Sequence, residues 1–441
     1  MSILATDAGV ELAPDPGRAI ARLFLPGEST PGGEPRTEGV LARVLATSPD
    51  AIAAEAWSIL DRFGARHDGL VATLRANAAA VRAPGAPDLD DDMAIVVGAA
   101  FTAEYSVEGT ALCNPSAVAH PDQSGLAPGQ LRVMLSLRSI GEPHLSSVQF
   151  CEAVIGPGRR WEFLPRQAPL SRAVVSADAD SSYRAVFDPT SGLSTRVLFP
   201  VTDEESHGIE DVRLVAFEHD GGREYRGTFT AYDGGSIASK LLTTTDFREF
   251  AVRSLTGPPA WTKGMALFPR LVGGMHLALG RTDGESLGLA RSPDGLDWST
   301  EEPLHGPDAL WEVVQSGNCG PPIETAAGWL VLTHGVAPMR VYSIGAILLE
   351  LADPSHVIGV LPGPLVEPSG LDGGGYVPNV VYSCGGIVHD GVLWIPHGVD
   401  DARIRVVSVE LDALLAAMRP PSPSTWIRPD LSRRDRRPGD Q

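Results

Sequence analysis

Two ten-residue stretches, LLTTTDFREF at residues 241–250 and LARSPDGLDW at residues 289–298, carry the same short pattern. In each, a run typical of a β-strand is followed by Ser or Thr, then Asp, then an aromatic residue. The two stretches lie about 48 residues apart, a spacing that suits one four-stranded blade of a β-propeller. The repeat therefore favours a propeller, with two unrelated hairpin turns as the alternative on this match alone.

The chain around these stretches has the same character from residue 84 to about residue 410. Short apolar or alternating runs are separated by Gly, Pro, Asn and Asp, which is typical of an all-β protein. More than about 300 residues of short strands exceed what one β-sandwich usually holds, so a propeller of several blades is favoured. The candidate strands are 94–100, 131–137, 147–153, 195–200, 212–217, 225–231, 275–280, 286–291, 329–333, 343–350, 379–383, 392–396 and 403–409.

The N-terminal part of the chain differs in composition. Its first 40 residues are rich in Pro and Gly, which predicts a segment that does not order itself alone. The following residues are rich in Ala and place apolar side chains at helical spacing, so we expect helices at about 48–65 and 66–82. Their apolar stripe is the basis for expecting a possible homo-oligomer. The predicted domains are a flexible leader (1–40), a helical extension (41–83), a propeller (84–418) and a disordered tail (419–441).

Charge and composition exclude several classes of function. The 441 residues include 55 Asp and Glu against 35 Lys and Arg, a formal net charge of −20, so nucleic acid is not an expected partner. Apolar runs are far shorter than the roughly 20 residues of a membrane helix, and no signal-peptide pattern is present, so we expect no membrane partner and a cytoplasmic protein. Four scattered cysteines without a CxxC pair argue against a zinc site and a disulfide framework. Neither a metal nor an organic cofactor is expected.

Adjacent acidic residues open one predicted strand, in the stretch GIEDVR at residues 208–213. Neighbouring side chains on a strand point to opposite faces, so Glu210 and Asp211 are expected to play different roles. One would enter a cleft while the other pairs with an arginine such as Arg213. A solvated acidic turn is the alternative for this dipeptide taken alone.

Four further polar residues lie beside apolar strands: Lys263, Arg281, His334 and Tyr342. Lys263 is one of only two lysines in a chain that otherwise uses Arg, which suggests a specific role for a compact ammonium group. If the four converged, they would form a pocket for phosphate or a carboxylate. Ordinary strand-end positions, and for His334 a buried structural histidine, are the alternatives.

Taken in order, ten segments of the chain resemble glycoside hydrolase family 130, which comprises β-mannoside phosphorylases and mannosidases built on a five-bladed β-propeller. The resemblance covers about residues 95–410 and implies an all-β, five-bladed β-propeller with an N-terminal α-helical extension. It also implies an inverting enzyme that cleaves β-mannosides or related glycosides, with an oligosaccharide or small glycoside as substrate. The segments are NPSAV (114–118), LSLR (135–138), GIEDVR (208–213), KGMALFP (263–269), LGR (279–281), GPPI (320–323), GWLVLTHG (328–335), YSIGAILL (342–349), DP (353–354) and VPNVV (377–381).

The resemblance implies roles for individual residues. Asp211 matches the acid that protonates the glycosidic oxygen, in phosphorylases through a sugar hydroxyl, although Val212 replaces the proline of the family's Glu-Asp-Pro-Arg motif. The family's phosphate site matches Lys263, Arg281, His334 and Tyr342, and Gln315 stands where a further cation would be expected. Inorganic phosphate is thus a possible co-substrate. The residues matched to the sugar site are Asn114, Arg138, Glu142, His144, Glu210, Arg213 and Asp400.

Two alternatives to phosphorolysis stay open. Hydrolysis with inversion would need a base at about 6.5–9.5 Å from the acid, and Glu324 is the first choice for it, ahead of Asp400 or Asp401. A propeller can also bind carbohydrate without catalysis. Phosphorolysis is slightly favoured, because hydrolases of the family tend to lose the His and Arg residues that this chain keeps.

Overall fold

The computed structural model describes residues 4–26, 36–142, 144–178, 180–219, 221–369 and 374–422. The chain forms two compact units: one combines Met1–Pro14, Thr110–Arg166 and Arg172–Gln441, and the other combines Asp15–Gly109 with Gln167–Ser171. The predicted boundaries at 40/41 and 83/84 are therefore wrong, because the second unit begins earlier and ends later than the expected helical extension. The predicted tail lies outside the described residues from 423 onward.

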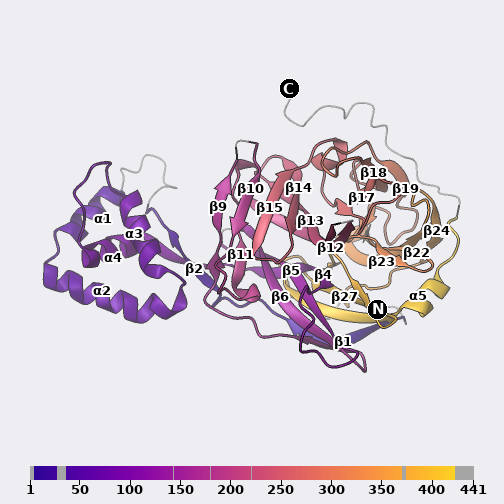
Figure 1. Cartoon of the computed structure of the whole chain (residues 1–441), viewed down its shortest axis with the longest axis horizontal. Coiled ribbons are helices and arrows are strands. Elements are labelled where there is room, and N and C mark those ends of the chain that lie inside the picture. The colour runs from indigo at the N-terminus through magenta and orange to yellow at the C-terminus, as the bar shows by residue number, and fades with distance from the viewer. Residues whose placement is uncertain are drawn as a thin grey trace. The chain divides into compact units, whose positions relative to one another are not determined.

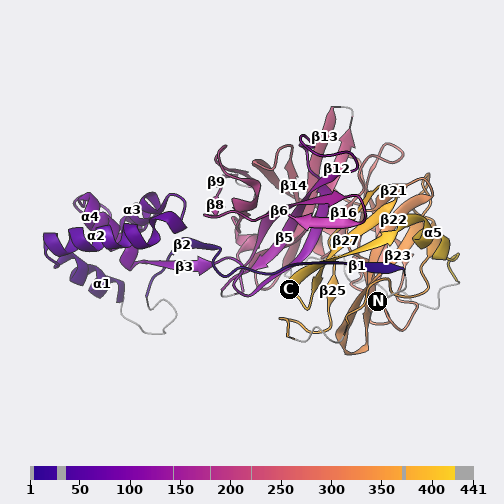
Figure 2. The same ribbon diagram turned by 90° about the horizontal axis from the view of Figure 1, so that it is seen from below.

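The larger unit is a five-bladed β-propeller (Figure 1; Figure 2). Blades one and two share one sheet, but a single parallel residue pair, Gly208 with Ser146, joins them. Blade one comprises β4 (Ala111–Ala119), β5 (Leu131–Ile140), β6 (Ser146–Gly156) and β7 (Arg160–Phe163), and blade two comprises β12 (Gly208–His219), β13 (Gly222–Tyr232), β14 (Ile237–Thr244), β15 (Glu249–Ser254), β10 (Tyr183–Val186) and β9 (Val174–Ala177). Blade three comprises β16 (Ala266–Leu267), β17 (His276–Gly280), β18 (Leu287–Ser292) and β19 (Glu302–His305), and blade four comprises β20 (Gln315–Asn318), β21 (Ile323–Thr325), β22 (Gly328–Ala337), β23 (Val341–Leu349) and β24 (Val357–Val360). Blade five comprises β25 (Val381–Tyr382), β26 (Ile387–His389), β27 (Val392–Val399), β28 (Arg403–Glu410) and β1 (Ala5–Leu12). The remaining elements of this unit are β11 (Arg196–Leu198), α5 (Leu411–Ala417) and the short helices η2 (Leu193–Thr195), η3 (Asp203–Glu205), η4 (Pro258–Trp261) and η5 (Pro338–Arg340), while β8 (Ser171–Arg172) spans the boundary.

The fifth blade takes its outer strand from the start of the chain. β1 pairs antiparallel with β28, with Ala5 opposite Val409. The expected leader is thus wrong for this segment, because the strand is stabilised by a partner some 400 residues away that local composition cannot reveal. Backbone hydrogen bonds then link the fifth blade to the first, from Leu112 N to Ala402 O (3.1 Å) and from Cys384 N to Pro115 O (2.8 Å).

The predicted repeat is confirmed as the turn between the third and fourth strands of blades two and three. Thr244 Oγ1 accepts a hydrogen bond from Phe247 N (2.9 Å), and Ser292 Oγ accepts one from Gly295 N (2.8 Å). In both turns the following Asp, Asp246 or Asp294, accepts hydrogen bonds from backbone N–H groups, which explains the recurring Ser/Thr and Asp.

All four cysteines are buried and free.

The smaller unit is mostly helical. Helices α2 (Pro49–Phe63) and α3 (Leu70–Ala80) confirm the two predicted helices. Residues 94–100, predicted as a strand, belong instead to helix α4 (Asp91–Ala100). Asp90 caps this helix by accepting a hydrogen bond from Met93 N (2.8 Å), and an apolar run this short does not by itself distinguish helix from strand. No helix in the described ranges is long and apolar enough to cross a bilayer. The unit's elements are β2 (Ala19–Leu23), α1 (Arg36–Leu45), α2 (Pro49–Phe63), η1 (Gly64–Arg66), α3 (Leu70–Ala80), α4 (Asp91–Ala100) and β3 (Thr102–Ser106).

Candidate active site

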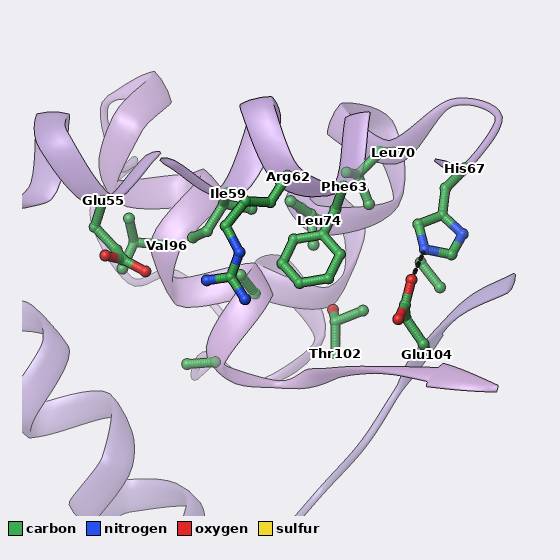
Figure 3. A pocket seen from close by; sticks show the side chains of 13 residues that line it. Glu55, Ile59, Arg62, Phe63, His67, Leu70, Leu74, Val96, Thr102 and Glu104 are labelled. Atoms are coloured by element: carbon green, nitrogen blue, oxygen red, sulfur yellow. Dashed lines mark hydrogen bonds and ion pairs between the residues drawn. The ribbon is translucent and has the colours of Figure 1, made fainter. Parts of the chain in front are cut away.

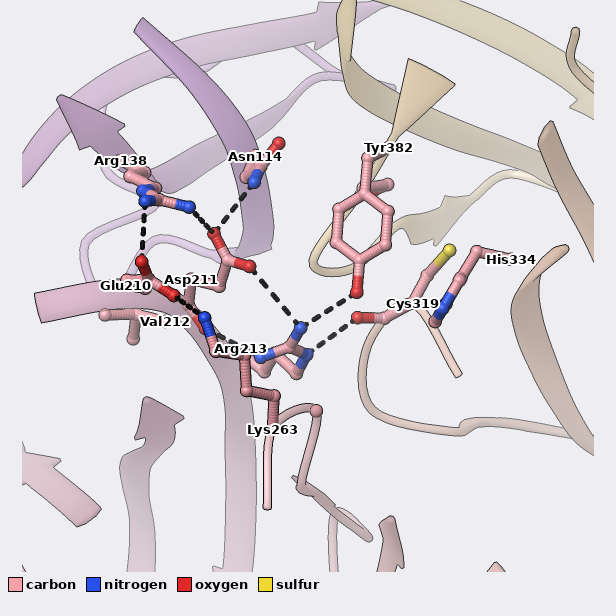
Figure 4. Close-up of polar contacts among 12 residues, drawn as sticks. Asn114, Arg138, Glu210, Asp211, Val212, Arg213, Lys263, Cys319, His334 and Tyr382 are labelled. Atoms are coloured by element: carbon pink, nitrogen blue, oxygen red, sulfur yellow. Dashed lines mark hydrogen bonds and ion pairs between the residues drawn. The ribbon is translucent and has the colours of Figure 1, made fainter. Parts of the chain in front are cut away.

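Asn114 and Asp211 lie in β-bulges on the innermost strands of two neighbouring blades. The register of β4 shifts between Cys113 and Ser116, and that of β12 shifts between Glu210 and Arg213. Asn114 (φ 48°) and Asp211 (φ 56°) have left-handed backbone, which Asn and Asp tolerate better than most residues. The bulges re-aim both side chains, so that Asn114 Nδ2 donates a hydrogen bond to Asp211 Oδ1 at 2.8 Å (Figure 4).

The bulge at Asp211 breaks the alternation of a regular strand. Arg138 lies 2.8 Å from a carboxylate oxygen of Glu210 and 3.5 Å from one of Asp211 (Figure 4). The expectation that the two acids point to opposite faces is therefore wrong, because the extra residue turns both toward one arginine. Lys263 lies on the other side of Glu210, with its Nζ 2.6 Å from Oε2.

Cations surround the carboxyl group of Asp211. Burial alone would raise its pKa, but Arg138, Arg213, the hydrogen bond from Asn114 and Lys263 together lower the pKa of Asp211 below its usual value. Arg213 is itself fixed, because it donates to Cys319 O and to Tyr382 OH, each at 2.9 Å. In the unliganded protein, Asp211 is thus an anion in a positively charged surrounding.

A cavity of about 230 Å³ opens beside Asp211 and holds all four predicted anion-binding residues. Two of the seven residues matched to the sugar site, Asn114 and Arg213, line the same cavity. The cavity is lined by Asn114, Asp211, Arg213, Lys263, Gly264, Arg281, Gln315, His334, Arg340, Tyr342, Val377, Val380, Tyr382 and Asp401.

His334 in this cavity is neutral. Its Nδ1 lies 3.1 Å from the carbonyl oxygen of Asn318, an acceptor, so the ring proton is assigned to Nδ1. Nε2 then accepts from Arg281 NH1 (2.9 Å) and from Gln315 Nε2 (3.0 Å). Burial, Arg281 and Arg213 hold the pKa of His334 well below its usual value. His334 therefore orients Arg281 and Gln315 and adds no charge of its own.

Glu324, the expected base for hydrolysis, does not line the cavity of Asp211. Its two carboxylate oxygens accept from Arg270 at 2.7 and 2.8 Å, and both residues line a different cavity from that of Asp211. The hydrogen bonds from Arg270 lower the pKa of Glu324. The structure thus does not bring this carboxylate to the acid whose base it was expected to be.

Asp401, and not its neighbour Asp400, lines the cavity beside Asp211. Asp400 is buried, and its Oδ1 accepts a hydrogen bond from Asn379 N (2.9 Å), so it supports a loop. Asp401 lines the cavity, and burial, opposed by Arg138, raises its pKa to about 6. The sequence analysis named Asp401 only as an alternative base and matched Asp400, not Asp401, to the sugar site.

The remaining sugar-site matches lie at the β5–β6 turn. Glu142 and His144 are both exposed. His144 stacks on Tyr376, with ring centroids 5.6 Å apart, and its Nδ1 lies 3.3 Å from the Tyr376 hydroxyl. Tyr376 and Tyr382 were not expected from the sequence; Tyr382 directly follows the matched segment at residues 377–381.

The smaller unit has a cavity of its own, of about 480 Å³ (Figure 3). Apolar side chains such as Leu70 and Val96 line most of it, and at one end His67 Nε2 lies 2.8 Å from Glu104 Oε1. It contains none of the predicted site residues. Although it is larger, it lacks the convergent cations and carboxyl group found in the propeller.

The five-bladed propeller and the family match reported next make this chain an enzyme that acts on glycosides. A family model described as beta-1,4-mannooligosaccharide phosphorylase matches residues 191–420. The chain belongs to this family, glycoside hydrolase family 130.

Relatives of known activity match parts of the chain. A 1,2-β-oligomannan phosphorylase of Thermoanaerobacter sp. (strain X514) is 32% identical over 222 residues, which are 50% of this chain and 74% of the relative. A β-1,2-mannobiose phosphorylase of Listeria innocua is 30% identical over 226 residues, 49% of this chain and 62% of the relative. A solved structure of the Listeria innocua enzyme with β-1,2-mannobiose has a TM-score of 0.53 at 19% identity, covering 71% of this chain and 92% of that one, which shows the shared fold.

Proposed function

We propose that this enzyme cleaves β-mannosides by phosphorolysis with inversion, with Asp211 as the general acid. Phosphate attacks the anomeric carbon, the bond from that carbon to the glycosidic oxygen breaks, and the departing oxygen takes a proton from Asp211, directly or through a sugar hydroxyl. The products are a sugar 1-phosphate and the shortened glycoside. The observation that carries the proposal is the single cavity in which Asp211 faces Lys263, Arg281 and Tyr342.

Phosphate would prepare the acid as well as supply the nucleophile. A general acid must be protonated before the bond breaks, but the surrounding cations lower the pKa of Asp211. A phosphate dianion bound at Lys263 and Arg281 would offset part of this positive field. We therefore expect the pKa of Asp211 to rise when phosphate binds.

The distribution of carboxyl groups favours phosphorolysis over hydrolysis. Water would need a base, whereas phosphate carries its own charge. Of the described cavity-lining residues, only Asp211 and Asp401 bear carboxyl groups. Glu324, the expected base, is paired with Arg270 in another cavity. Asp401 interacts electrostatically with Arg138 and with Asp211, and we assign it to a sugar hydroxyl.

The names of the relatives suggest where to begin with substrates. The two relatives reported above are phosphorylases of β-1,2-linked mannosides, so we infer that β-1,2-mannobiose and longer β-1,2-mannosides are the first candidates. The β-1,4-linked mannosides named in the family description are the second.

The proposal is tested by incubating the purified protein with these mannosides, with and without inorganic phosphate. Mannose 1-phosphate formed only with phosphate is the expected result. Free mannose released at the same rate without phosphate would overturn phosphorolysis in favour of hydrolysis. Binding of mannosides without either product would favour a carbohydrate-binding propeller.

A further inference from the structure

Arg340 lies in the turn that joins β22 to β23 and lines the same cavity as Gln315 and Tyr342. No sequence motif pointed to this residue. The strands on either side are paired up to the turn, with Ala337 opposite Val341. Tyr342 is also fixed from outside the hairpin, because its N–H donates to Asn379 O at 3.0 Å. The turn thus holds an arginine at the rim of the proposed phosphate site.

The backbone of this turn is strained. Met339 (φ 65°) and Arg340 (φ 56°) both have left-handed conformation, and neither is a residue type that favours it. Such strain persists where the surrounding structure imposes it and is frequent at binding and catalytic sites. Met339 is 89% exposed and has no packing role that would explain the turn. The strained backbone is instead explained by the position that it gives to Arg340, which lines the cavity.

The cationic groups of the site are mostly engaged before any anion arrives. Lys263 is paired with Glu210 at 2.6 Å, and Arg213 lies 3.8 Å from an oxygen of Asp211. His334 is neutral, and Gln315 carries no charge. Arg340 is exposed and forms no ion pair with any residue in the described ranges. Lys263 therefore shares its charge with Glu210, whereas Arg281 and Arg340 have no carboxylate partner among the described residues.

We propose that Arg340 binds the attacking phosphate and supplies the positive charge that Gln315 does not. This inference rests on the phosphorolysis proposed above. A guanidinium group can donate two parallel hydrogen bonds to phosphate oxygens. Its position on an exposed turn would let phosphate enter and leave while the half-buried Arg281 stays in place. Phosphate affinity is then controlled from the β22–β23 turn.

The test uses Arg340→Gln and Arg340→Lys in the full chain, with Arg159→Gln as the matched control. Arg159 also has left-handed backbone (φ 60°) in an exposed turn, between β6 and β7, and lines no part of this cavity. For Arg340→Gln we expect the KM for phosphate to rise about tenfold or more, because a charge-assisted hydrogen bond is lost. The KM for mannoside at saturating phosphate should change little. An unchanged KM for phosphate in Arg340→Gln overturns the inference.

A second variant separates charge from folding. Adding Gln315→Arg to Arg340→Gln returns a cation to the same cavity from β20, so we expect it to recover part of the phosphate affinity. If neither this double variant nor Arg340→Lys recovers any affinity, the turn matters for shape and the proposed role is wrong.

Calorimetric titration with inorganic phosphate makes the inference independent of the reaction. If the wild type only hydrolyses mannosides, phosphorolysis fails, yet phosphate binding that weakens in Arg340→Gln still supports Arg340 as an anion ligand. Phosphate binding that is equal in wild type and Arg340→Gln removes the role, whatever reaction the enzyme catalyses.

Discussion

The amide of Asn114 donates a 2.8 Å hydrogen bond to Oδ1 of Asp211, and both residues hold a left-handed backbone conformation on neighbouring blades. Two bulges thus face each other across the boundary between blades. The other amide atom, Asn114 Oδ1, is buried and has no hydrogen-bond partner among the described residues, so the contact with Asp211 is the side-chain hydrogen bond by which Asn114 acts on the site.

Asn114→Gly keeps the backbone conformation and removes the amide. We expect kcat/KM for mannoside to fall by about 10- to 100-fold, the effect of one or two hydrogen bonds to charged or buried groups. Asn379→Gly is the control, because Asn379 (φ 64°) is also left-handed but does not line the cavity. Steady-state kinetics of both variants measure the effect, and equal kinetics in the two would contradict the assignment.

Asp211→Asn should remove the proton donor and leave the site formed. We expect kcat to fall by about 10²- to 10⁴-fold with mannoside binding retained, as for loss of a general acid. Glu324→Gln should lose little activity, since its partner is Arg270 in another cavity. Kinetics and ligand titration of both variants distinguish the roles, and a loss in Glu324→Gln as large as that in Asp211→Asn would restore Glu324 as a candidate base.

Asp401 should lower the stability of the folded protein at neutral pH. Its pKa is raised from 3.8 to about 6, so between these values the folded state keeps a proton that the unfolded state has lost. Stability relative to Asp401→Asn therefore falls as pH rises from about 4 to about 6 and is constant above. Above pH 6, Asp401→Asn should be more stable by about 1–3 kcal/mol and less active. Urea unfolding of both proteins at pH 4.5 and 7.5 measures the difference, and parallel stabilities at the two pH values would refute it.

Lys240, the second lysine of the chain, should be structural. It is fully buried, 3.1 Å from Glu204 and 3.2 Å from Glu205, and Glu205 is fully buried as well. Lys240→Met would leave that carboxylate without its cation, which costs about 3–5 kcal/mol of unfolding free energy. Arg223→Met, at the exposed ion pair with Glu218, should cost less than about 1 kcal/mol. Chemical denaturation of both variants provides the measurement, and equal losses would contradict the role of Lys240.

The sequence predicted what depends on local pattern or on a resemblance: the blades, the turn repeat and the convergence of Lys263, Arg281, His334 and Tyr342. It failed where one residue changes the direction of a side chain. The bulge at Asp211 turns Glu210 and Asp211 toward the same arginine, Arg138. In the loop before β28, Asp401 lines the cavity, whereas Asp400 accepts a hydrogen bond that supports a loop. The period of two in a strand carries no sign of such an insertion.

Contacts between distant segments were the other source of error. The pairing of Glu324 with Arg270 depends on how blades three and four pack, and nothing in the stretch PPIETAAGW at residues 321–329 indicates it. The helix at 91–100 was predicted as a strand from its apolar run, although the acidic cap at residues 90–92 was a visible signal.

The pairing of β1 with β28 sets the order in which the ring of blades can be completed during synthesis. The ribosome makes β1 roughly 400 residues before its partner β28, on the order of 20–80 s earlier at ordinary rates of elongation. Until then the fifth blade lacks its outer strand, while the smaller unit, encoded directly after β1, is already complete apart from Gln167–Ser171. A strand that is synthesised early therefore cannot pair until β28 has been made, so the fifth blade is completed only late in synthesis.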